Sequence, residues 1–268
     1  MRPRLSLDQT QLGHYLAGFI EGDGYFGPTK LEIAYHSKDK SAAYALRSSL
    51  GYGQIYAYSK NPKAVRFVVT NQAGLSHVLS LVNGKLVHDA KVNMLKKNGY
   101  DKFCALKPAR KKISLTNAWL TGFLDAHGSL GIFLAPSKTH KAGLSVRLEV
   151  KISQKEPFLL QALAQIFNTN KIYKHKTKSD FKLNLTGLKR LKTLFVYLDH
   201  FQLRSKKYVQ YFLLRKAYLK CVEKKHLQPD GLQLIADLKT RLQNVYKTKV
   251  HLGSSETTRS TPESSRSG

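Results

Sequence analysis

The chain has little cysteine, few acidic residues and no long apolar run, and these shortages exclude several classes of protein. Its two cysteines, Cys104 and Cys221, are too few for a disulfide framework and lack the spacing of a zinc site, which indicates a reducing compartment. No segment approaches the roughly 18 consecutive apolar residues of a membrane span. No apolar stretch of secretory length follows the basic N-terminus. We therefore expect a soluble protein with no signal peptide and no membrane partner.

The shortage of acid leaves a large positive charge. Only 17 Asp and Glu residues oppose 45 Lys and Arg residues, so the formal net charge is +28. The bases are spread along the 268 residues instead of forming one tail, which predicts a folded basic surface. Such a surface repels itself unless a polyanion lies on it. Nucleic acid is the favoured partner; an anionic membrane surface and a ribosomal-type structural role are the alternatives.

Two nine-residue segments of one pattern lie 104 positions apart, LAGFIEGDG at 16–24 and LTGFLDAHG at 120–128. Both have large apolar residues at positions 1, 4 and 5, small residues at 2, 3 and 7, an acid at 6 and glycine at 9. On a helix, positions 3 and 7 share a face, and small residues there let two helices approach closely. Glycine inside a helix costs about 1 kcal/mol relative to alanine, so its repeated use implies a packing need. We predict that the two motif helices pack as a pseudo-twofold pair.

The sequence after each motif repeats as well. Alternating residues at 31–36 and 144–153 predict strands, and helical patterns follow at 42–50 and 157–167; predicted hairpins then span 54–69 and 171–185, and closing helices span 90–97 and 205–220. The fold is therefore predicted to be α+β, with two tandem αββαββα units related by pseudo-twofold symmetry. We place them at 11–100 and 116–250, joined by a linker at 101–115 and followed by a disordered tail at 251–268.

The second unit is longer than the first. The hairpins match at an offset of 117 residues and the motifs at 104, so about 13 extra residues are expected in the turn at 135–142. That basic turn is either an arm that reaches along a ligand or a surface loop. An accessory helix is predicted at 230–247, where leucines recur at helical spacing.

Position 8 of the motif is Asp23 in one copy and His127 in the other. Each lies at the end of its helix, before a glycine that we expect to serve as the C-cap. An aspartate at the negative end of a helix dipole is disfavoured unless a cation offsets it. Mg²⁺ is commonly bound by one or two carboxylates together with phosphate oxygens, so it suits Asp23. Because the helices pair, the two position-8 groups should lie close together, as in two-metal phosphodiester hydrolysis. The alternative is that Asp23 is a solvated acid at a helix end.

These motifs resemble those of the LAGLIDADG homing endonucleases, in the form with two copies per chain, and the resemblance covers about 11–247. It implies that the motif helices form the interface and that two antiparallel sheets form a DNA-binding saddle over the major groove. It also implies Mg²⁺ or another divalent cation, and cleavage of double-stranded DNA at a long asymmetric target by a monomer. By family habit, the protein is expected in an organelle, mitochondrion or chloroplast.

Carried over residue by residue, the resemblance assigns catalytic roles to Asp23, His127, Gln154, Lys91 and Lys207, and metal ligation to Asp23, Gly22 and Ala126. The position in the first half that matches Gln154 is taken as residue 37, a serine. The acids at position 6, Glu21 and Asp125, are expected to support helix ends. DNA contacts are expected from polar residues that alternate with core residues on the strands: Glu32, Arg66, Arg147, Lys151, Lys182, Asn184 and Thr186.

His127 departs from the acid expected at its position. A neutral imidazole is a poor magnesium ligand, so cleavage is expected to be weakened, strand-biased or limited to nicking. Alternatively, a metal shared through Asp23 suffices and His127 donates a hydrogen bond or proton. Two other functions stay open on the same fold: an intron RNA maturase, and a DNA-binding protein impaired in cleavage. The positive net charge does not distinguish an endonuclease from a maturase, because DNA and RNA are both polyanions.

Overall fold

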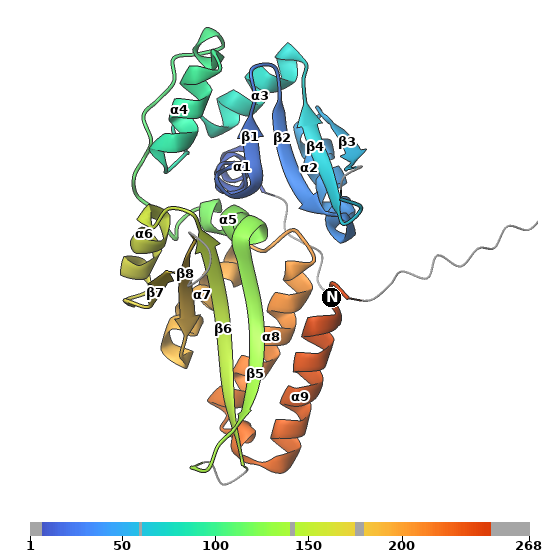
Figure 1. The fold of residues 1–268 in the computed structure, drawn as a ribbon, viewed down its shortest axis with the longest axis vertical. Coiled ribbons are helices and arrows are strands. Elements are labelled where there is room, and N and C mark those ends of the chain that lie inside the picture. The colour runs from blue at the N-terminus through green and yellow to red at the C-terminus, as the bar shows by residue number, and fades with distance from the viewer. Residues whose placement is uncertain (1–6, 59–60, 140–142, 175–179, 248–268) are drawn as a thin grey trace, which may run out of the picture.

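The computed structural model describes residues 7–58, 61–139, 143–174 and 180–247. In Figure 1 the N-terminal half lies above the C-terminal half, with helices α1 (Gln9–Asp23) and α5 (Trp119–His127) at their boundary. The tail predicted to be disordered, 251–268, lies outside the described residues, as do residues 248–250. Within the described ranges no helix is long and apolar enough to cross a bilayer.

In the first half, α1 is followed by a four-stranded antiparallel sheet in the order β1-β2-β4-β3. Its elements are β1 (Gly24–Phe26), β2 (Leu31–His36), a 3₁₀ turn (Ser37–Asp39), α2 (Lys40–Leu50), β3 (Gln54–Ala57), β4 (Ala64–Val69), α3 (Gln72–Val82) and α4 (Asp89–Lys97). Strand β2 repeats the buried and half-exposed alternation that its sequence predicts.

In the second half, α5 is followed by a sheet in the equivalent order, β5-β6-β8-β7. Its elements are β5 (Gly128–Pro136), β6 (Leu144–Gln154), α6 (Phe158–Ile166), β7 (Ile172–Lys174), β8 (Phe181–Thr186), α7 (Leu188–His200), α8 (Lys207–Val222), a 3₁₀ turn (Lys225–Leu227) and α9 (Pro229–Asn244). The predicted fold class and the accessory C-terminal helix are therefore confirmed. Between the halves, a 3₁₀ turn (Tyr100–Lys102) leads into the segment that reaches α5.

Two details differ from the sequence-based expectation. Helices α3 and α7 were not predicted, although both have buried apolar residues at helical spacing. The extra length of the second unit lies mainly in strands β5 and β6, and β5 continues through Pro136, inside the predicted turn at 135–142. Residues 140–142 of that turn lie outside the described residues. The added residues extend β5 and β6 instead of forming a loop, because apolar residues alternate along both strands and let them pair.

The predicted pairing of the motif helices is confirmed, and glycine makes it possible. A Cβ added at Gly18 would lie 1.9 Å from the Trp119 carbonyl oxygen, and one at Gly122 would lie 1.9 Å from that of Tyr15. Backbone therefore touches backbone at both positions, and no larger residue fits without separating the helices. Leu16, Ile20 and Leu120 are buried beside these contacts and join the cores of the two halves.

Candidate active site

The paired helices end side by side and bring the two position-8 side chains together. His127 Nε2 lies 3.7 Å from Asp23 Oδ1, and the two side chains are 32% and 34% exposed. Behind them, a Cβ at Gly22 would lie 2.3 Å from Ala126 Cβ, so this contact also needs glycine. Gly24 and Gly128 are the C-cap residues, as predicted, and their backbone N–H groups donate to the carbonyls of Ile20 and Leu124. Both have extended backbones, with φ of −93° and −72°, because strands β1 and β5 begin directly at them.

The acids at position 6 are buried and hold the starts of α4 and α8, the corresponding helices of the two halves. Glu21 accepts hydrogen bonds from the backbone N–H groups of Val87 and His88, just before α4, at 2.7 and 2.5 Å. Asp125 accepts from the N–H of Arg204 at 2.7 Å and from the Ser205 hydroxyl at 2.5 Å, just before α8. The expectation that these acids support helix ends is met in this geometry.

A second pair of contacts crosses between the motif helices, and the sequence analysis missed it. The Trp119 indole donates to Glu21 Oε2 at 2.6 Å, and the Tyr15 hydroxyl donates to Asp125 Oδ2 at 3.0 Å. Tyr15 and Trp119 are related by the same 104-residue offset as the motifs, which is the signal that could have found them. Burial raises the pKa of Glu21 to about 7 and also raises the pKa of Asp125. These carboxyls are thus fixed in place by donors that leave them unsuited to metal ligation.

Lys91 and Lys207 occupy equivalent places beside the ends of the motif helices. Lys91 Nζ donates to the Gly24 carbonyl at 2.5 Å. Lys207 Nζ donates to the carbonyls of Asp125 and Ala126 at 2.6 and 2.9 Å. Burial lowers the pKa of both ammonium groups, and nearby carboxylates oppose that shift. Each lysine is therefore a cation held close to the Asp23–His127 pair.

A pocket of about 540 Å³ opens on one side of that pair. Asp23, His127, Gln154 and Lys91 all line it, so the structure brings together four of the five predicted catalytic residues. Gly22 lines it too. Further lining residues that the sequence analysis did not single out are His88, Ser153, Lys155, Glu156 and Asp180. The pocket joins both halves, and His88 Nε2 lies 2.7 Å from a Glu156 carboxylate oxygen across it.

A smaller pocket of about 220 Å³ lies on the other side and contains Lys207, the fifth predicted catalytic residue. Asp23 lines this pocket as well, together with Ala126 and Tyr35. The match of Gln154 to residue 37 is wrong. Strand register pairs Gly24 with Ile33 and Gly128 with Ile152, so Tyr35 is the counterpart of Gln154. The segment from Ile33 to Ile55 is two residues longer than its counterpart from Ile152 to Ile172, and this difference caused the misalignment.

The smaller pocket is also partly filled by the end of the described chain. The Tyr246 hydroxyl donates to Asp39 Oδ2 at 2.8 Å, and the Tyr246 ring packs edge-on against His36 with centroids 5.0 Å apart. Asp39 Oδ1 accepts from the backbone N–H of Lys206 at 2.7 Å. The two pockets around Asp23 therefore differ in size and in the residues that line them.

The residues predicted to contact DNA lie on the sheet faces that point away from the core. Cross-strand pairs place Lys151 opposite Asn184, and Glu149 opposite Thr186, while the intervening residues Val150, Leu183 and Leu185 are buried. In the first half, Glu32 contacts Arg66 at 3.4 Å. All seven predicted residues share this orientation: Glu32, Arg66, Arg147, Lys151, Lys182, Asn184 and Thr186.

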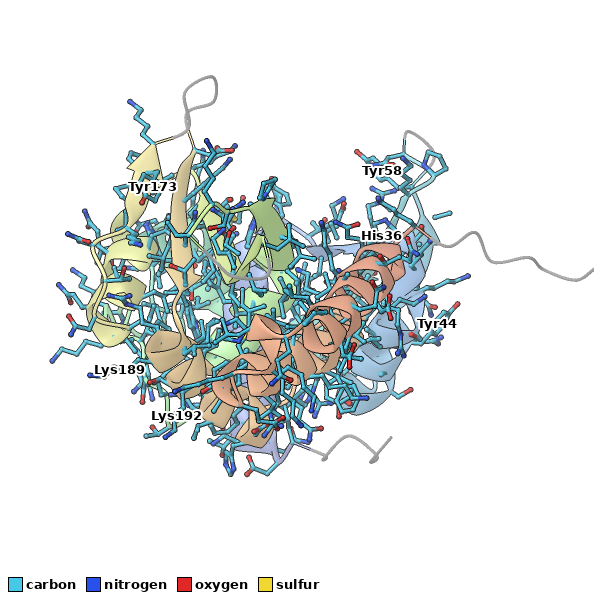
Figure 2. All side chains as sticks on the ribbon, turned by 90° about the horizontal axis from the view of Figure 1, so that it is seen from below. His36, Tyr44, Tyr58, Tyr173, Lys189 and Lys192 are labelled. Carbon is cyan, nitrogen blue, oxygen red and sulfur yellow. The ribbon has the colours of Figure 1, made fainter. Side chains whose placement is uncertain are left out.

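The same faces carry exposed tyrosines that the sequence could not orient. Tyr56 pairs with Arg66, and Tyr173 pairs with Lys182. The two residues are 51% and 53% exposed, and their positions are separated by the 117-residue offset of the hairpins. In Figure 2 the labelled Tyr58 and Tyr173 stand on hairpins that project on one side of the molecule, whereas Lys189 and Lys192 lie on the opposite side.

Comparison with known proteins agrees with this geometry. Residues 120–218 match a family model described as LAGLIDADG endonuclease. A 37.2 kDa protein of cox1 intron 2 from Schizosaccharomyces pombe is 34% identical over 239 residues, covering 85% of this chain and 72% of that protein. A probable intron-encoded endonuclease 4 of Neurospora crassa is 29% identical, covering 85% of this chain and 44% of its own length. The intron-encoded RNA maturase bI4 of Saccharomyces cerevisiae is 27% identical, covering 78% and 32%.

Solved structures show the same fold at low identity. The meganuclease I-SmaMI bound to uncleavable DNA superposes with a TM-score of 0.69 at 18% identity, covering 85% of this chain and 97% of its own. I-SmaMI bound to an uncleaved DNA target in the presence of calcium ions gives 0.65 at 17% identity, covering 89% and 99%. With its duplicated motif helices, its two matching sheets and these relatives, the chain belongs to the LAGLIDADG endonuclease family.

Proposed function

We propose that this chain is a site-specific endonuclease that hydrolyses double-stranded DNA with Mg²⁺ or another divalent cation, as a monomer with a long asymmetric target. The observation that carries the proposal is the placement of Asp23, Lys91 and Gln154 around one 540 Å³ pocket at the helix ends. Relatives encoded in introns, one of them in cox1, support an organellar setting and the homing type of site.

The DNA-facing surface has hydrogen-bonding capacity that the protein leaves unused. Within the described residues, Arg66 Nε, Asn184 Oδ1 and Gln154 Nε2 are buried and have no hydrogen-bond partner. Buried polar atoms without a partner are costly, so a ligand that supplies donors and acceptors relieves that cost. Base edges and phosphate oxygens supply both.

The residues present suit a hard cation that DNA helps to hold. No cluster of three His, Cys, Asp or Glu side chains with metal-site geometry occurs in the described part of the chain. Asp23, with the backbone at Gly22 and Ala126, would therefore hold Mg²⁺ together with phosphate oxygens, as is common for this ion. When bound, the cation supplies positive charge against the charge that develops on the phosphate during hydrolysis.

The side chains that line the larger pocket are placed to position the phosphate and to balance its charge. Lys91 Nζ, tied to Gly24, is a fixed cation beside the larger pocket and stabilises extra negative charge on the phosphate oxygens. Gln154 Nε2 is free to donate a hydrogen bond to an oxygen in the same pocket. His127, half-exposed at the pocket wall, is placed to donate or accept a proton through Nε2.

The difference between the two pockets favours strand-biased cleavage. Asp23 lines both, but the smaller pocket has Tyr35 where the larger has Gln154, and Tyr246 occupies part of it. If each pocket receives one scissile phosphate, the strand in the larger pocket is cut faster, and a nicked intermediate accumulates. His127 lines the larger pocket and is a poorer Mg²⁺ ligand than an acid, so its presence there reduces this bias.

A strand-resolved cleavage assay tests the proposal. A duplex that the parent protein cuts is first selected from a randomised library, with Mg²⁺, and both strands are labelled at different ends. Asp23→Asn removes the charge but keeps the size of the side chain. We expect at least a hundredfold loss of cleavage of both strands with little change in DNA affinity, because binding rests on the sheets. Selection that yields no cleaved duplex, in any divalent cation, contradicts the endonuclease proposal.

Gln154→Ala is the matched variant for the strand bias, because Gln154 lines only the larger pocket. We expect it to slow one strand by about tenfold or more and to leave the other within about twofold. An equal loss on both strands would show that the pockets do not act separately, while leaving the nuclease assignment intact.

An RNA maturase is the second candidate, and the likeness to the yeast maturase bI4 is the observation that favours it. Binding of the precursor RNA that contains the coding intron, measured with and without competing target DNA, separates the two. Acceleration of intron splicing by the Asp23→Asn variant would show a maturase activity independent of the nuclease site.

A further inference from the structure

The two halves differ most in the hairpin that follows each motif helix. Strands β1 and β2 form three residue pairs, from Gly24–Ile33 to Phe26–Leu31. Strands β5 and β6 form nine, from Gly128–Ile152 to Pro136–Leu144. The first three pairs correspond, so six pairs, Gly131–Glu149 to Pro136–Leu144, exist only in the second half. We call these six pairs the hairpin extension. At about 3.3 Å per residue it is roughly 20 Å long, and Figure 1 shows it running away from the helix interface.

The underside of the hairpin extension is covered by α8, the counterpart of α4, and by α9, which has no counterpart among the described residues of the first half. Ile132 and Leu148 are buried, and Leu134 and Val146 pack against the core. Helices α8 and α9 both contact β5 along this side, and α9 contributes buried residues such as Ile235 and Leu238. An accessory helix is thus the consequence of a longer hairpin, since a two-stranded ribbon is not stable without cover on one face.

The upper face of the hairpin extension continues the DNA-facing side of the sheet. Phe133 and Arg147 are opposite each other there, and the Arg147 guanidinium lies 4.9 Å from the centre of the Phe133 ring. Both remain accessible: the Phe133 residue is 38% exposed and the Arg147 side chain 63%. An arginine stacked on an exposed aromatic ring loses little side-chain freedom on binding, and its fork pairs with guanine O6 and N7.

The carboxylate of Glu149 orients two basic side chains, those of Arg147 and Lys151. Glu149 is 5% exposed, and its carboxylate oxygens lie 3.7 Å from Arg147 Nε and 3.1 Å from Lys151 Nζ. Glu149 thus links Arg147, in the hairpin extension, to Lys151, in the part of the hairpin that both halves have. Glu149 is therefore a positioning residue that acts through Arg147 and Lys151.

We propose that the hairpin extension is a specificity element for duplex DNA that gives the C-terminal half a longer half-site than the N-terminal half. Its length of roughly 20 Å corresponds to about six base pairs at 3.4 Å each. Arg147, ordered by Phe133 and Glu149, reads base edges in the outer part of that half-site. This inference rests on the proposed DNA endonuclease function and adds the asymmetry of its target.

Selection and footprinting test the proposal separately from the nuclease assignment. Duplexes bound by the full chain in calcium are enriched from a library randomised over about 30 base pairs, sequenced, and footprinted with hydroxyl radicals. We expect base preference and protection to extend about six base pairs farther on one side of the centre. Arg147→Ala and Phe133→Ala should each reduce preference at those outer positions by about tenfold, with inner positions unchanged.

Two matched variants complete the design. Arg66→Ala, on the first-half sheet, should alter preference only on the other side of the centre. Lys192→Ala removes one positive charge from α7, away from the projecting hairpins in Figure 2, and should change no base preference. Failure of the parent to enrich any duplex overturns the proposed function itself. Enrichment of a duplex with equal half-sites, or outer preferences that survive Arg147→Ala, overturns the hairpin proposal while the endonuclease assignment stands.

Discussion

At the scale of single residues, positions 6 and 8 of the motif differ in role: one supports the structure and the other faces the candidate site. Positions 6 and 8 both carry acids in the first copy, yet Glu21 is buried among three donors while Asp23 faces two pockets. Burial penalises the charged form of Glu21, so its pKa rises to about 7. An acid whose pKa is higher in the folded state binds protons more tightly there. Its contribution to stability therefore falls as pH rises from about 4.5 to 7.

Replacement of Glu21 by glutamine isolates that contribution. Glutamine does not ionise, so the free energy of unfolding of Glu21→Gln should lack the decline seen in the parent. From pH 4.5 to 7.5, the stability advantage of the parent over the variant should shrink by on the order of 1–3 kcal/mol. Urea unfolding at several pH values measures it. Glu223→Gln is the control. The surface residues Lys220 and Lys225 lower the pKa of Glu223, so its contribution to stability does not decline over this pH range. A constant difference between parent and Glu21→Gln would show that Glu21 is not protonated in this way.

At the element scale, helices α1 and α5 are in direct backbone contact at two glycines. Helices α1 and α5 cross where Gly18 and Gly122 lie, and the carbonyl of Tyr15 occupies the space that a Cβ at Gly122 would need. The same close approach fixes the 3.7 Å separation of Asp23 and His127. A change in the packing of these helices would therefore also change the distance between Asp23 and His127 at the candidate site.

Gly122→Ala should show that link. Alanine improves helix propensity by up to about 1 kcal/mol, but the clash with backbone forces the helices apart, and overpacking of this kind costs about 1–3 kcal/mol. We expect net destabilisation in thermal unfolding and at least a tenfold loss of cleavage under conditions where the variant is folded. Ala45→Gly, at an exposed site on α2, gives the propensity effect alone. Unchanged stability and cleavage in Gly122→Ala would mean that the helices do not touch as described.

The whole molecule carries a charge that matters more for binding than for folding. A formal +28 on 268 residues opposes compaction, and a bound polyanion offsets it. Arg66, Lys151 and Lys182 place part of that charge on the side that the two sheets share. Phosphate contacts of this kind release counterions, so DNA affinity depends on salt.

The affinity for a selected duplex should fall steeply with salt. If six to ten phosphates are neutralised, affinity drops by about 10³–10⁵ between 50 and 200 mM salt. Fluorescence anisotropy titrations at fixed pH give the slope. Lys182→Ala should reduce it by about one phosphate contact and weaken binding to all sequences alike. A flat dependence would contradict nucleic acid as the partner of this surface.

The sequence by itself determined the duplication and most of the elements, α3 and α7 excepted. Local periodicity at 31–36 and 144–153 is enough to specify half-buried strands, because strand alternation depends on neighbours along the chain. Small residues four apart within each motif give a helix a close-packing face, and the repeat of that pattern after 104 residues is enough to predict a pair of such helices. The closeness of Asp23 and His127 followed from that pairing.

Only the tertiary structure decided what depends on register and on distant contacts. A shift of two residues moved the counterpart of Gln154 from residue 37 to Tyr35, since strand pairing, not the count along the chain, sets equivalence. The Trp119–Glu21 bond, the Tyr246–Asp39 contact and the cover of the hairpin extension by α9 join residues that no local pattern connects. Packing of segments far apart in sequence made the two pockets unequal, because each half supplies different side chains to a shared interface.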